Sequence, residues 1–284
     1  NQKLLPGRLY VGVMAPAHLS LQTTQARVFA NLMQWPNTPQ LTDLERDPWW
    51  TLLCFFNSLR ELGSATTLLI GDAREYLRVI ADRHKNPDGS IMPIRSPFIE
   101  ELTSRIPSGE IPEKLGQLNL SYEPTTAGAE SDWAKRPIDV CLASSIIEVG
   151  VDVPRLSLMT VIGQPKTTAQ YIQVTSRVGR KSVRPGLVFT LYGAGKSRDR
   201  SHYERFKSYH QKIYSNVEPT SVTPFSIPAI ERTLHALIVS YIRQVSPLRT
   251  GAERPTPAPF EIHEYLKTSL KDIINRRVAT VSPD

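Results

Sequence analysis

Short, continuous apolar runs alternate with segments of helical spacing over most of the first 200 residues. A run that is apolar at every position is typical of a strand covered on both faces of a sheet. Strands are expected at Leu9–Met14, Thr51–Phe56, Thr66–Ile70, Phe98–Thr103, Ile138–Ala143, Leu158–Ile162 and Leu187–Tyr192. Helices are expected at Gln22–Gln34, from the cap Asn57-Ser58 through Leu62, and at Ile111–Leu118. This alternation predicts an α/β fold with a doubly wound, mostly parallel sheet.

Polar stretches interrupt this alternation of strands and helices, and the strands are absent from the last part of the chain. Loops are expected at Trp35–Pro48, 84–97 and 121–137, which are rich in proline or in small polar residues. Beyond Ser201 the strand pattern stops. Helices are then expected at Tyr203–Tyr214, Ala229–Val245 and Ile262–Arg277. The predicted organisation is therefore an N-terminal strand-helix segment (1–48), a sheet domain (49–200) and a helical extension (201–284).

Charge adds an asymmetry to this picture. The chain of 284 residues carries a net charge of +7. Residues 1–136 hold 14 Lys/Arg and 15 Asp/Glu, a net of −1, whereas residues 137–284 hold 20 and 12, a net of +8. The excess is densest from Thr175 to Ser215. A basic field suits a polyanion such as nucleic acid, although a solvated basic face is the alternative.

Other compositional features narrow the setting. No apolar run approaches the roughly 18 residues that would span a bilayer. The start lacks both an initiator Met and a signal-peptide pattern, so the sequence is expected to be a piece of a longer chain. The two cysteines, Cys54 and Cys141, lie in apolar runs and are expected to be buried, inert thiols. A cytoplasmic location is the default expectation.

One segment imitates a phosphate-binding loop. Gly193 to Ser197 follows a strand and ends in Gly-Lys-Ser, but a true P-loop needs a Gly at the position of Thr190. No acidic pair that would hold Mg²⁺ follows an apolar strand. The chain is thus expected to lack both parts of a nucleotide-hydrolysing site and to bind no metal by itself. The segment is interpreted as a basic loop that contacts nucleic acid, or as one without a function.

Two further segments carry the candidate chemistry. Ser144 and Ser145 end a buried strand, so their polar groups emerge at the carboxyl edge of the sheet, where open α/β sheets bind ligands. Gly150 permits a bend before Asp152, whose carboxylate suits hydroxyl groups such as those of a ribose. If Arg177 and Arg180 lie on a helix, their spacing places both on one face, where two guanidinium groups can converge on one phosphate.

Taken together, these segments resemble motifs V and VI of superfamily 2 helicases. Motif VI has the pattern Gln or His, three residues, Arg, one residue, Gly, Arg, which Gln173, Arg177, Gly179 and Arg180 match. Motif V has a small hydroxyl residue, a Gly six residues later and an Asp two beyond, which Ser144, Gly150 and Asp152 match. Thr51 to Asn57 resembles motif IV. One departure is Ser176, where Gly is commoner.

A closer resemblance is to the helicase subunit of the DISARM anti-phage defence systems. It rests on Gly163 to Thr168 running into Tyr171-Ile172-Gln173, on Tyr209-His210, and on Val217 to Phe225. The fold this implies is the C-terminal RecA-like lobe of a helicase, followed by a helical extension.

The resemblance also implies roles. Arg180, as the arginine finger, and Arg177 would reach the γ-phosphate of an ATP held with Mg²⁺ by a first RecA-like lobe, and Gln173 would sense the same phosphates. Asp152 would contact the ribose, with Gly150 allowing the approach. The residues implied to contact the nucleic-acid backbone are Ser144, Ser145, Thr103, Ser104 and Arg105. The basic residues Lys196, Arg198 and Arg200 are candidates for the same backbone on charge alone.

The expected function is that of one lobe of an ATP-dependent helicase or translocase, inactive as an ATPase on its own. The expected partners are nucleic acid, the first lobe of the same parent chain and a companion defence subunit. DNA is expected as the nucleic acid, although no residue pattern separates it from RNA. The alternative is a degenerate lobe that only scaffolds nucleic acid. Structural readings also stay open: Asp152 as a turn residue, Ser144 as a strand end, Arg105 as a solvated charge, and Trp49-Trp50 as packing rather than a base-stacking platform.

Overall fold

The computed structural model describes residues 7–15, 20–84, 89–90, 93–124, 135–148, 152–181, 184–219, 226–244, 264 and 266–281. The chain divides into two compact units, Asn1–Glu218 and Pro219–Asp284. The first unit extends past residue 200, the limit proposed from the sequence for the sheet domain.

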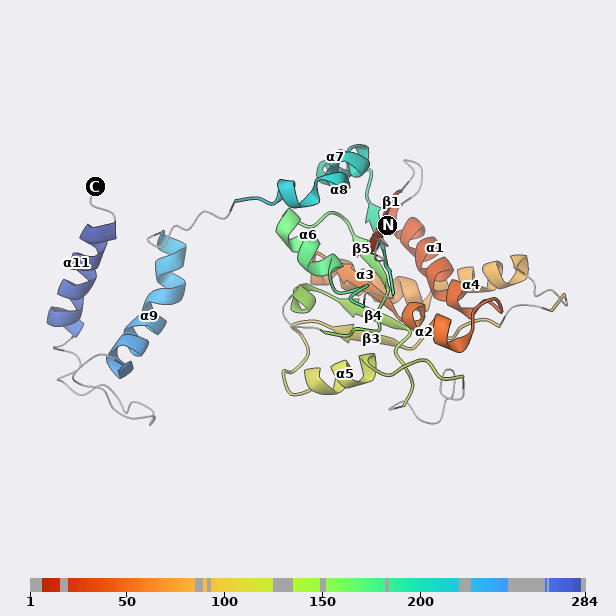
Figure 1. Cartoon of the computed structure of the whole chain (residues 1–284), viewed down its shortest axis with the longest axis horizontal. Helices are drawn as coiled ribbons and strands as arrows, with labels where there is room; N and C mark the ends of the chain where they lie inside the picture. The colour runs from red at the N-terminus through yellow and green to blue at the C-terminus, as the bar shows by residue number, and fades with distance from the viewer. Residues whose placement is uncertain are drawn as a thin grey trace, which may run out of the picture. The chain divides into compact units, whose positions relative to one another are not determined.

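The first unit is built on a six-stranded sheet with the order β1-β6-β5-β2-β4-β3 (Figure 1). The strands are β1 (Arg8–Met14), β2 (Leu52–Phe56), β3 (Ile99–Leu102), β4 (Val140–Ala143), β5 (Leu158–Ile162) and β6 (Gly186–Tyr192). Every neighbouring pair is parallel. The doubly wound, parallel sheet expected from the sequence is confirmed.

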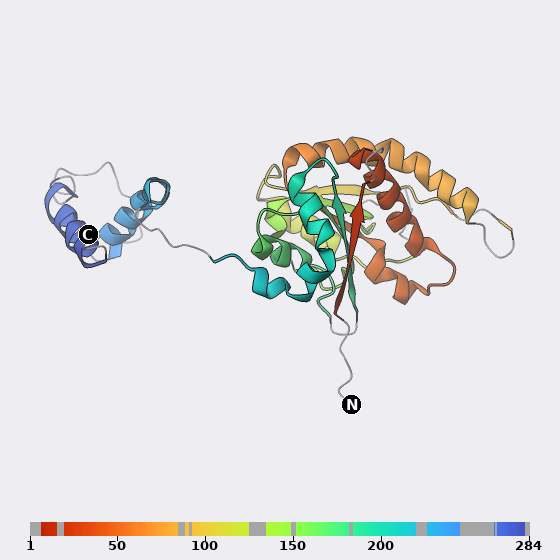
Figure 2. The same ribbon diagram turned by 90° about the horizontal axis from the view of Figure 1, so that it is seen from above.

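Helices cover both faces of the sheet because its inner strands are apolar at every position (Figures 1 and 2). Alternate residues of β2 supply opposite cores: Leu52 and Phe56 face one layer, while Leu53 and Phe55 face the other. The first layer is made by α1 (Leu21–Gln34), α3 (Leu59–Ile70) and α4 (Asp72–Arg83). The second is made by α5 (Ile111–Leu118), α6 (Thr168–Thr175) and α8 (Phe206–Gln211).

Two local predictions are wrong. Thr66–Ile70 is not a strand but the last part of α3, where Leu68 and Leu69 continue the buried helical stripe begun by Leu62 and Ala65. The predicted loop Trp35–Pro48 overlaps α2 (Asp43–Trp50), which begins inside it. A capping box begins this helix, since Thr42 accepts from the amide of Glu45 and the Glu45 side chain returns to the amide of Thr42.

The segment after β6 is more helical than the sequence suggested. α7 (Ser197–Glu204) follows a short turn, and α8 and a 3₁₀ turn, η3 (Ile213–Asn216), complete the unit. The helix expected at Tyr203–Tyr214 therefore begins earlier and is interrupted between α7 and α8.

The second unit contains α9 (Ile227–Gln244), the π-helical turn η4 (Leu266–Leu270) and α11 (Lys271–Val281). These lie where the sequence predicted its last two helices. Across the described residues, no helix combines the length and the hydropathy needed to cross a membrane.

Both cysteines are buried and unbonded, as predicted. Burial raises the pKa of the Cys54 thiol to about 12, and it raises the pKa of Cys141 as well. Because a protonated thiol is a weak nucleophile, neither cysteine is a candidate for chemistry.

Trp50 packs inside the fold, one of the two roles considered for it: it is 6% exposed, and the guanidinium of Arg95 lies over its ring at 3.6 Å.

Candidate functional site

The parallel sheet places the candidate residues at two opposite edges. Ser144 and Thr103 directly follow β4 and β3, so they lie at the carboxyl edge. Asp152 and Arg180 lie at the amino edge. The amide of Leu187, at the start of β6, donates to Ser157 (2.7 Å), and the amide of Gly179 donates to Leu156 (2.9 Å). These bonds tie the segments of Asp152 and Arg180 to the beginnings of β5 and β6.

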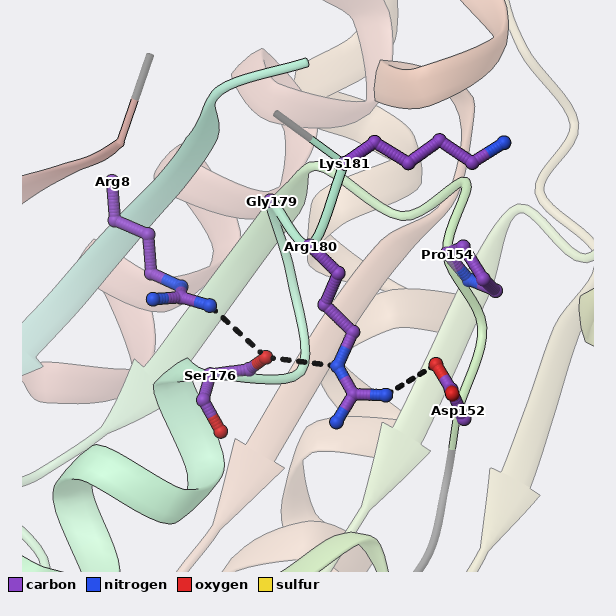
Figure 3. Close-up of a pocket in the computed structure, with 7 residues that line it drawn as sticks. All are labelled: Arg8, Asp152, Pro154, Ser176, Gly179, Arg180 and Lys181. Carbon is purple, nitrogen blue, oxygen red and sulfur yellow. Dashed lines mark hydrogen bonds and ion pairs between the residues drawn. The ribbon is translucent and has the colours of Figure 1, made fainter. Parts of the chain in front are cut away.

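Arg180 and Asp152 meet in an open pocket of about 520 Å³, here named the arginine pocket (Figure 3). Its described lining residues are Arg8, Asp152, Pro154, Ser176, Gly179, Arg180 and Lys181. Nη1 of Arg180 forms an ion pair with the Asp152 carboxylate, and its Nε donates to the carbonyl of Ser176 (3.2 Å). Both ends stay accessible, with the side chains 28% and 68% exposed respectively. A guanidinium and a carboxylate are thus presented together on one surface.

The backbone turn that carries Arg180 is fixed by a glycine. Gly179 has a φ of +64°, a conformation that L side chains rarely adopt. A Cβ built there would lie 2.4 Å from the backbone nitrogen of Gly186. Arg8 holds the same turn, since its Nε donates to the carbonyl of Val178 (2.8 Å) and its Nη2 to that of Ser176 (3.2 Å). The position of Arg180 is therefore set by close backbone packing.

The structure changes the expected placement of the two arginines. α6 ends at Thr175, so Arg177 and Arg180 lie in the turn that follows and do not share a helical face. Gln173 is exposed on α6, and Arg177 is half-buried; neither is among the described lining residues of the arginine pocket. Gly150 lies outside the described residues. Of the predicted nucleotide-contacting residues, the structure brings together Asp152 and Arg180.

The candidate residues whose side chains carry hydroxyl groups lie at the carboxyl edge. Ser144 is buried, and Ser145 is exposed at the start of the 3₁₀ turn η2 (Ser145–Glu148). The Thr103 hydroxyl donates to Glu101. Arg105 donates from Nε and Nη2 to the two oxygens of Glu101 (3.0 and 2.9 Å). Glu101 therefore already partners both Thr103 and Arg105, a neighbour that sequence reasoning missed.

The basic turn after β6 lies at the same edge. Lys196 pairs with Glu61 of α3 (2.5 Å), Arg200 donates to the carbonyl of Ala194 (3.0 Å), and Arg198 is exposed. The turn is organised by Asp199, which is 2% exposed. Its carboxylate accepts from the amides of Gln164 and Gly193, both at 2.9 Å. Sequence reasoning missed Asp199. It could have been noticed as an acidic residue near the beginning of an otherwise basic helix.

A second pocket, the α8 pocket, lies between α6, α7 and α8 and has a volume of about 460 Å³. Its lining is Thr168, Ser201, His202, Arg205, Ser208, Tyr209, Lys212 and Asn216. Burial, with help from Arg198, lowers the pKa of His202. The fixed positive charges of the lining are thus Arg205 and Lys212, and none of its described residues carries a carboxylate.

The nearby carboxylate of Glu218 is engaged elsewhere. Both of its oxygens accept from the amide of Thr168, at 2.8 and 2.9 Å. Glu218 therefore caps the first turn of α6, and these backbone bonds lower its pKa.

No metal site emerges from the described ranges, in which no three His, Cys, Asp or Glu side chains gather. The turn at Gly193–Ser197 also differs from a P-loop, because Thr190 lies inside β6 and not in a phosphate-wrapping turn. The donor set of the arginine pocket suits the phosphates and hydroxyls of a nucleotide rather than its Mg²⁺ ion.

Comparison with known proteins supports the two motifs. Residues 126–182 match the family described as "Helicase conserved C-terminal domain". The chain is 39% identical over 287 residues to the DISARM protein DrmA of Bacillus paralicheniformis, an alignment that covers 99% of this chain and 23% of DrmA.

Solved structures give the same fold. The DUF1998 helicase MrfA bound to DNA matches 93% of this chain and 29% of its own, with a TM-score of 0.54 and 14% identity. MrfA bound to DNA and AMPPNP matches 92% and 29%, with a TM-score of 0.51 and 12% identity. The chain thus spans less than a third of the length of these proteins. The chain thus has a RecA-like α/β fold similar to that of MrfA, its residues 126–182 match the helicase C-terminal domain family, and its sequence is similar to that of the DISARM protein DrmA.

Proposed function

We propose that this chain supplies the arginine-finger lobe of an ATP-dependent DNA helicase or translocase that acts in anti-phage defence. ATP and Mg²⁺ would be held mainly by the first RecA-like lobe of the same parent chain. The single observation that carries the proposal is the arginine pocket, where Arg180 and Asp152 are presented together at the amino edge and Gly179, with its left-handed backbone, fixes the turn that carries Arg180.

The geometry suggests how the lobe works. The Arg180 guanidinium stays accessible and is planar, so it can exchange Asp152 for a phosphate oxygen when the lobes close. Asp152, released from the ion pair, can accept hydroxyl groups of the ribose. Arg177, in the turn that carries Arg180, and Gln173, on α6, would complete the phosphate contacts. Hydrolysis would thereby depend on closure, and reopening would reset the grip on the nucleic acid.

The carboxyl edge is the proposed path of the nucleic-acid backbone. It combines the hydroxyls of Ser144, Ser145 and Thr103 with Arg105 and the basic turn of Lys196, Arg198 and Arg200. Such groups contact phosphates and carry no base readout. The proposal of DNA draws on the likeness to a DISARM protein and on the fold shared with MrfA, a helicase whose structure is bound to DNA. A companion defence subunit is proposed from the likeness to the DISARM protein.

The test uses a protein in which this chain is joined to its nucleotide-binding lobe. Arg180→Ala should lower nucleic-acid-stimulated ATP turnover by on the order of 10³–10⁵-fold, because an arginine finger stabilises charge that develops in the transition state. ATP affinity, measured with a fluorescent analogue, should change little. Arg180→Lys should restore little, since a point charge does not replace the planar fork. Near-normal turnover in Arg180→Ala would reject the role.

A scaffold lobe without a role in hydrolysis is the second candidate. The observation in its favour is that Arg180 and Arg105 already have carboxylate partners within the chain, as structural arginines do. The same experiment separates the two: a scaffold loses nucleic-acid affinity only through carboxyl-edge variants, and its partner lobe hydrolyses ATP equally well with Ala at position 180.

A further inference from the structure

Asp47 of α2 joins the two loops that form the arginine pocket. Its carboxylate Oδ1 accepts from Nη1 of Arg155 (3.3 Å), and its Oδ2 accepts from Nη1 of Arg184 (3.4 Å). Arg155 follows Asp152 by three residues, and Arg184 follows Arg180 by four. One carboxylate therefore reaches both the Asp152 loop and the Arg180 turn from outside either motif.

This carboxylate is buried and well held. Asp47 is 6% exposed, and its Oδ1 also accepts from the amide of Tyr122 at 2.8 Å. α2 is tied to the Asp152 loop a second time, because the amide of Ser157 donates to the carbonyl of Pro48 at 2.9 Å. Asp47 is thus fixed relative to both loops.

Arg155 makes this arrangement sensitive to charge. It is 5% exposed, and its guanidinium also donates to the carbonyl of Leu118 (2.9 Å) and to the hydroxyl of Thr51 (2.5 Å). Burial lowers the pKa of Arg155, and the charge of Asp47 is the main factor that opposes this. A neutral group at position 47 would leave a buried cation without its nearest counter-charge.

We propose that Asp47 is a positioning residue for the ATPase reaction, and that the two-loop clamp of Asp47, Arg155 and Arg184 sets the distance between Asp152 and Arg180. The proposal rests on the proposed function, because it assigns the pocket to ATP. Misplacing a reacting group by about 1 Å can cost on the order of 10²-fold in rate. A loosened clamp should therefore lower the rate of hydrolysis and spare the binding of ATP.

Asp47→Asn in the two-lobed protein tests this. The amide keeps an acceptor for Tyr122 and removes the charge that holds both arginines. We expect kcat to fall by at least about tenfold, with ATP affinity and nucleic-acid affinity each within about twofold of wild type. Arg184→Gln, at a side chain 25% exposed, breaks one arm with little burial cost and should lower kcat in the same direction, while Arg184→Lys should recover part of it.

Asp139→Asn is the matched control. Asp139 is also a buried carboxylate at the amino edge with two arginine partners, Arg95 and Arg136. Its partners lie in neither loop. We expect this variant to lower the melting temperature and to leave kcat per folded molecule near wild type.

Hydrogen exchange of the Gly179 amide gives a readout besides activity, because that amide donates to Leu156 and joins the two loops. It should exchange faster in Asp47→Asn than in Asp139→Asn. Equal exchange in the two variants, or a kcat in Asp47→Asn that is unchanged per folded molecule, would overturn the positioning role. If Arg180→Ala also left turnover intact, the proposed function would fail, whereas the exchange result would still decide whether the clamp exists.

Discussion

At the scale of single residues, the sequence could identify groups whose chemistry follows a spacing. Arg180 and Asp152 were found in this way, and the structure brings them into one pocket. Residues that act through contacts between distant parts of the sequence could not be identified in this way. Asp47 and Arg184 are 137 positions apart, and Glu218 lies 50 positions from the amide it caps. A pattern along the chain carries no information on such pairs until the fold is known.

Gly179 gives the first prediction at this scale. Its φ of +64° and the approach of Gly186 leave no room for a side chain. Gly179→Ala should lower the free energy of unfolding by about 1–3 kcal/mol, from backbone strain together with displacement of the turn. Gly63 lies in α3 with open space around it. Gly63→Ala should therefore raise the same quantity by about 0.5–1 kcal/mol. Urea melts of both variants measure it, and equal effects would contradict the steric argument.

At the scale of elements, burial on both faces made the inner strands predictable. The errors arose where a short apolar run fits a strand and a helix equally well. Thr66–Ile70 is apolar enough for a strand, but it continues the stripe of α3 that packs on the sheet. α2 was missed because three prolines near it resemble a loop, although Thr42 and Glu45 form a capping box that could have indicated a helix start.

The cap of α6 gives a prediction that depends on pH. The folded pKa of Glu218 is lowered below 4.5 by its bonds to the Thr168 backbone. Its stabilisation is therefore fully present above the unfolded pKa and is lost as the pH falls through the folded value. Glu218→Gln should cost about 0.3–1 kcal/mol at pH 7, the range for an anion at a helix N-terminus.

The difference between wild type and Glu218→Gln should shrink as the pH is lowered from 7 towards 3.5, when the melting temperatures of the two proteins are compared. Glu204→Gln, at an exposed residue of α7, removes the same charge without a cap and should show no such trend. A constant difference across this range would show that the Glu218 charge does not matter.

At the scale of the whole chain, the parallel sheet separates two groups of candidate residues. The arginine pocket lies at the amino edge, and the hydroxyl and basic candidates lie at the carboxyl edge. The sequence predicted a parallel sheet, but it did not show that the basic strip from Thr175 to Ser215 would run from one edge to the other. Variants at the two edges should accordingly differ in kind: those at the amino edge should affect hydrolysis, and those at the carboxyl edge nucleic-acid binding.

Variants in the α8 pocket test whether this part of the basic strip binds nucleic acid. Arg205 and Lys212 line this pocket. Lys207 belongs to α8, which also contributes lining residues, but it does not line the pocket itself. Neither Arg205 nor Lys212 forms one of the ion pairs recorded among the described residues. We predict that Arg205→Ala with Lys212→Ala weakens binding of single-stranded and duplex DNA alike, whatever the sequence. The slope of log affinity against log salt should flatten by roughly 0.7–0.9 per lost contact.

The control removes the same net charge from elsewhere: Lys207→Ala with Arg78→Ala, the latter at an exposed position of α4, which packs on the opposite face of the sheet. If general charge attracts the DNA, both double variants should weaken binding equally. If the α8 pocket holds a phosphate, only the first should flatten the salt slope. Unchanged affinity and slope in Arg205→Ala with Lys212→Ala would exclude this pocket from the path. The backbone contacts would then lie along the rest of the carboxyl edge, at its hydroxyl groups, at the basic turn of Lys196, Arg198 and Arg200, and at Arg105, whose guanidinium Glu101 must first release.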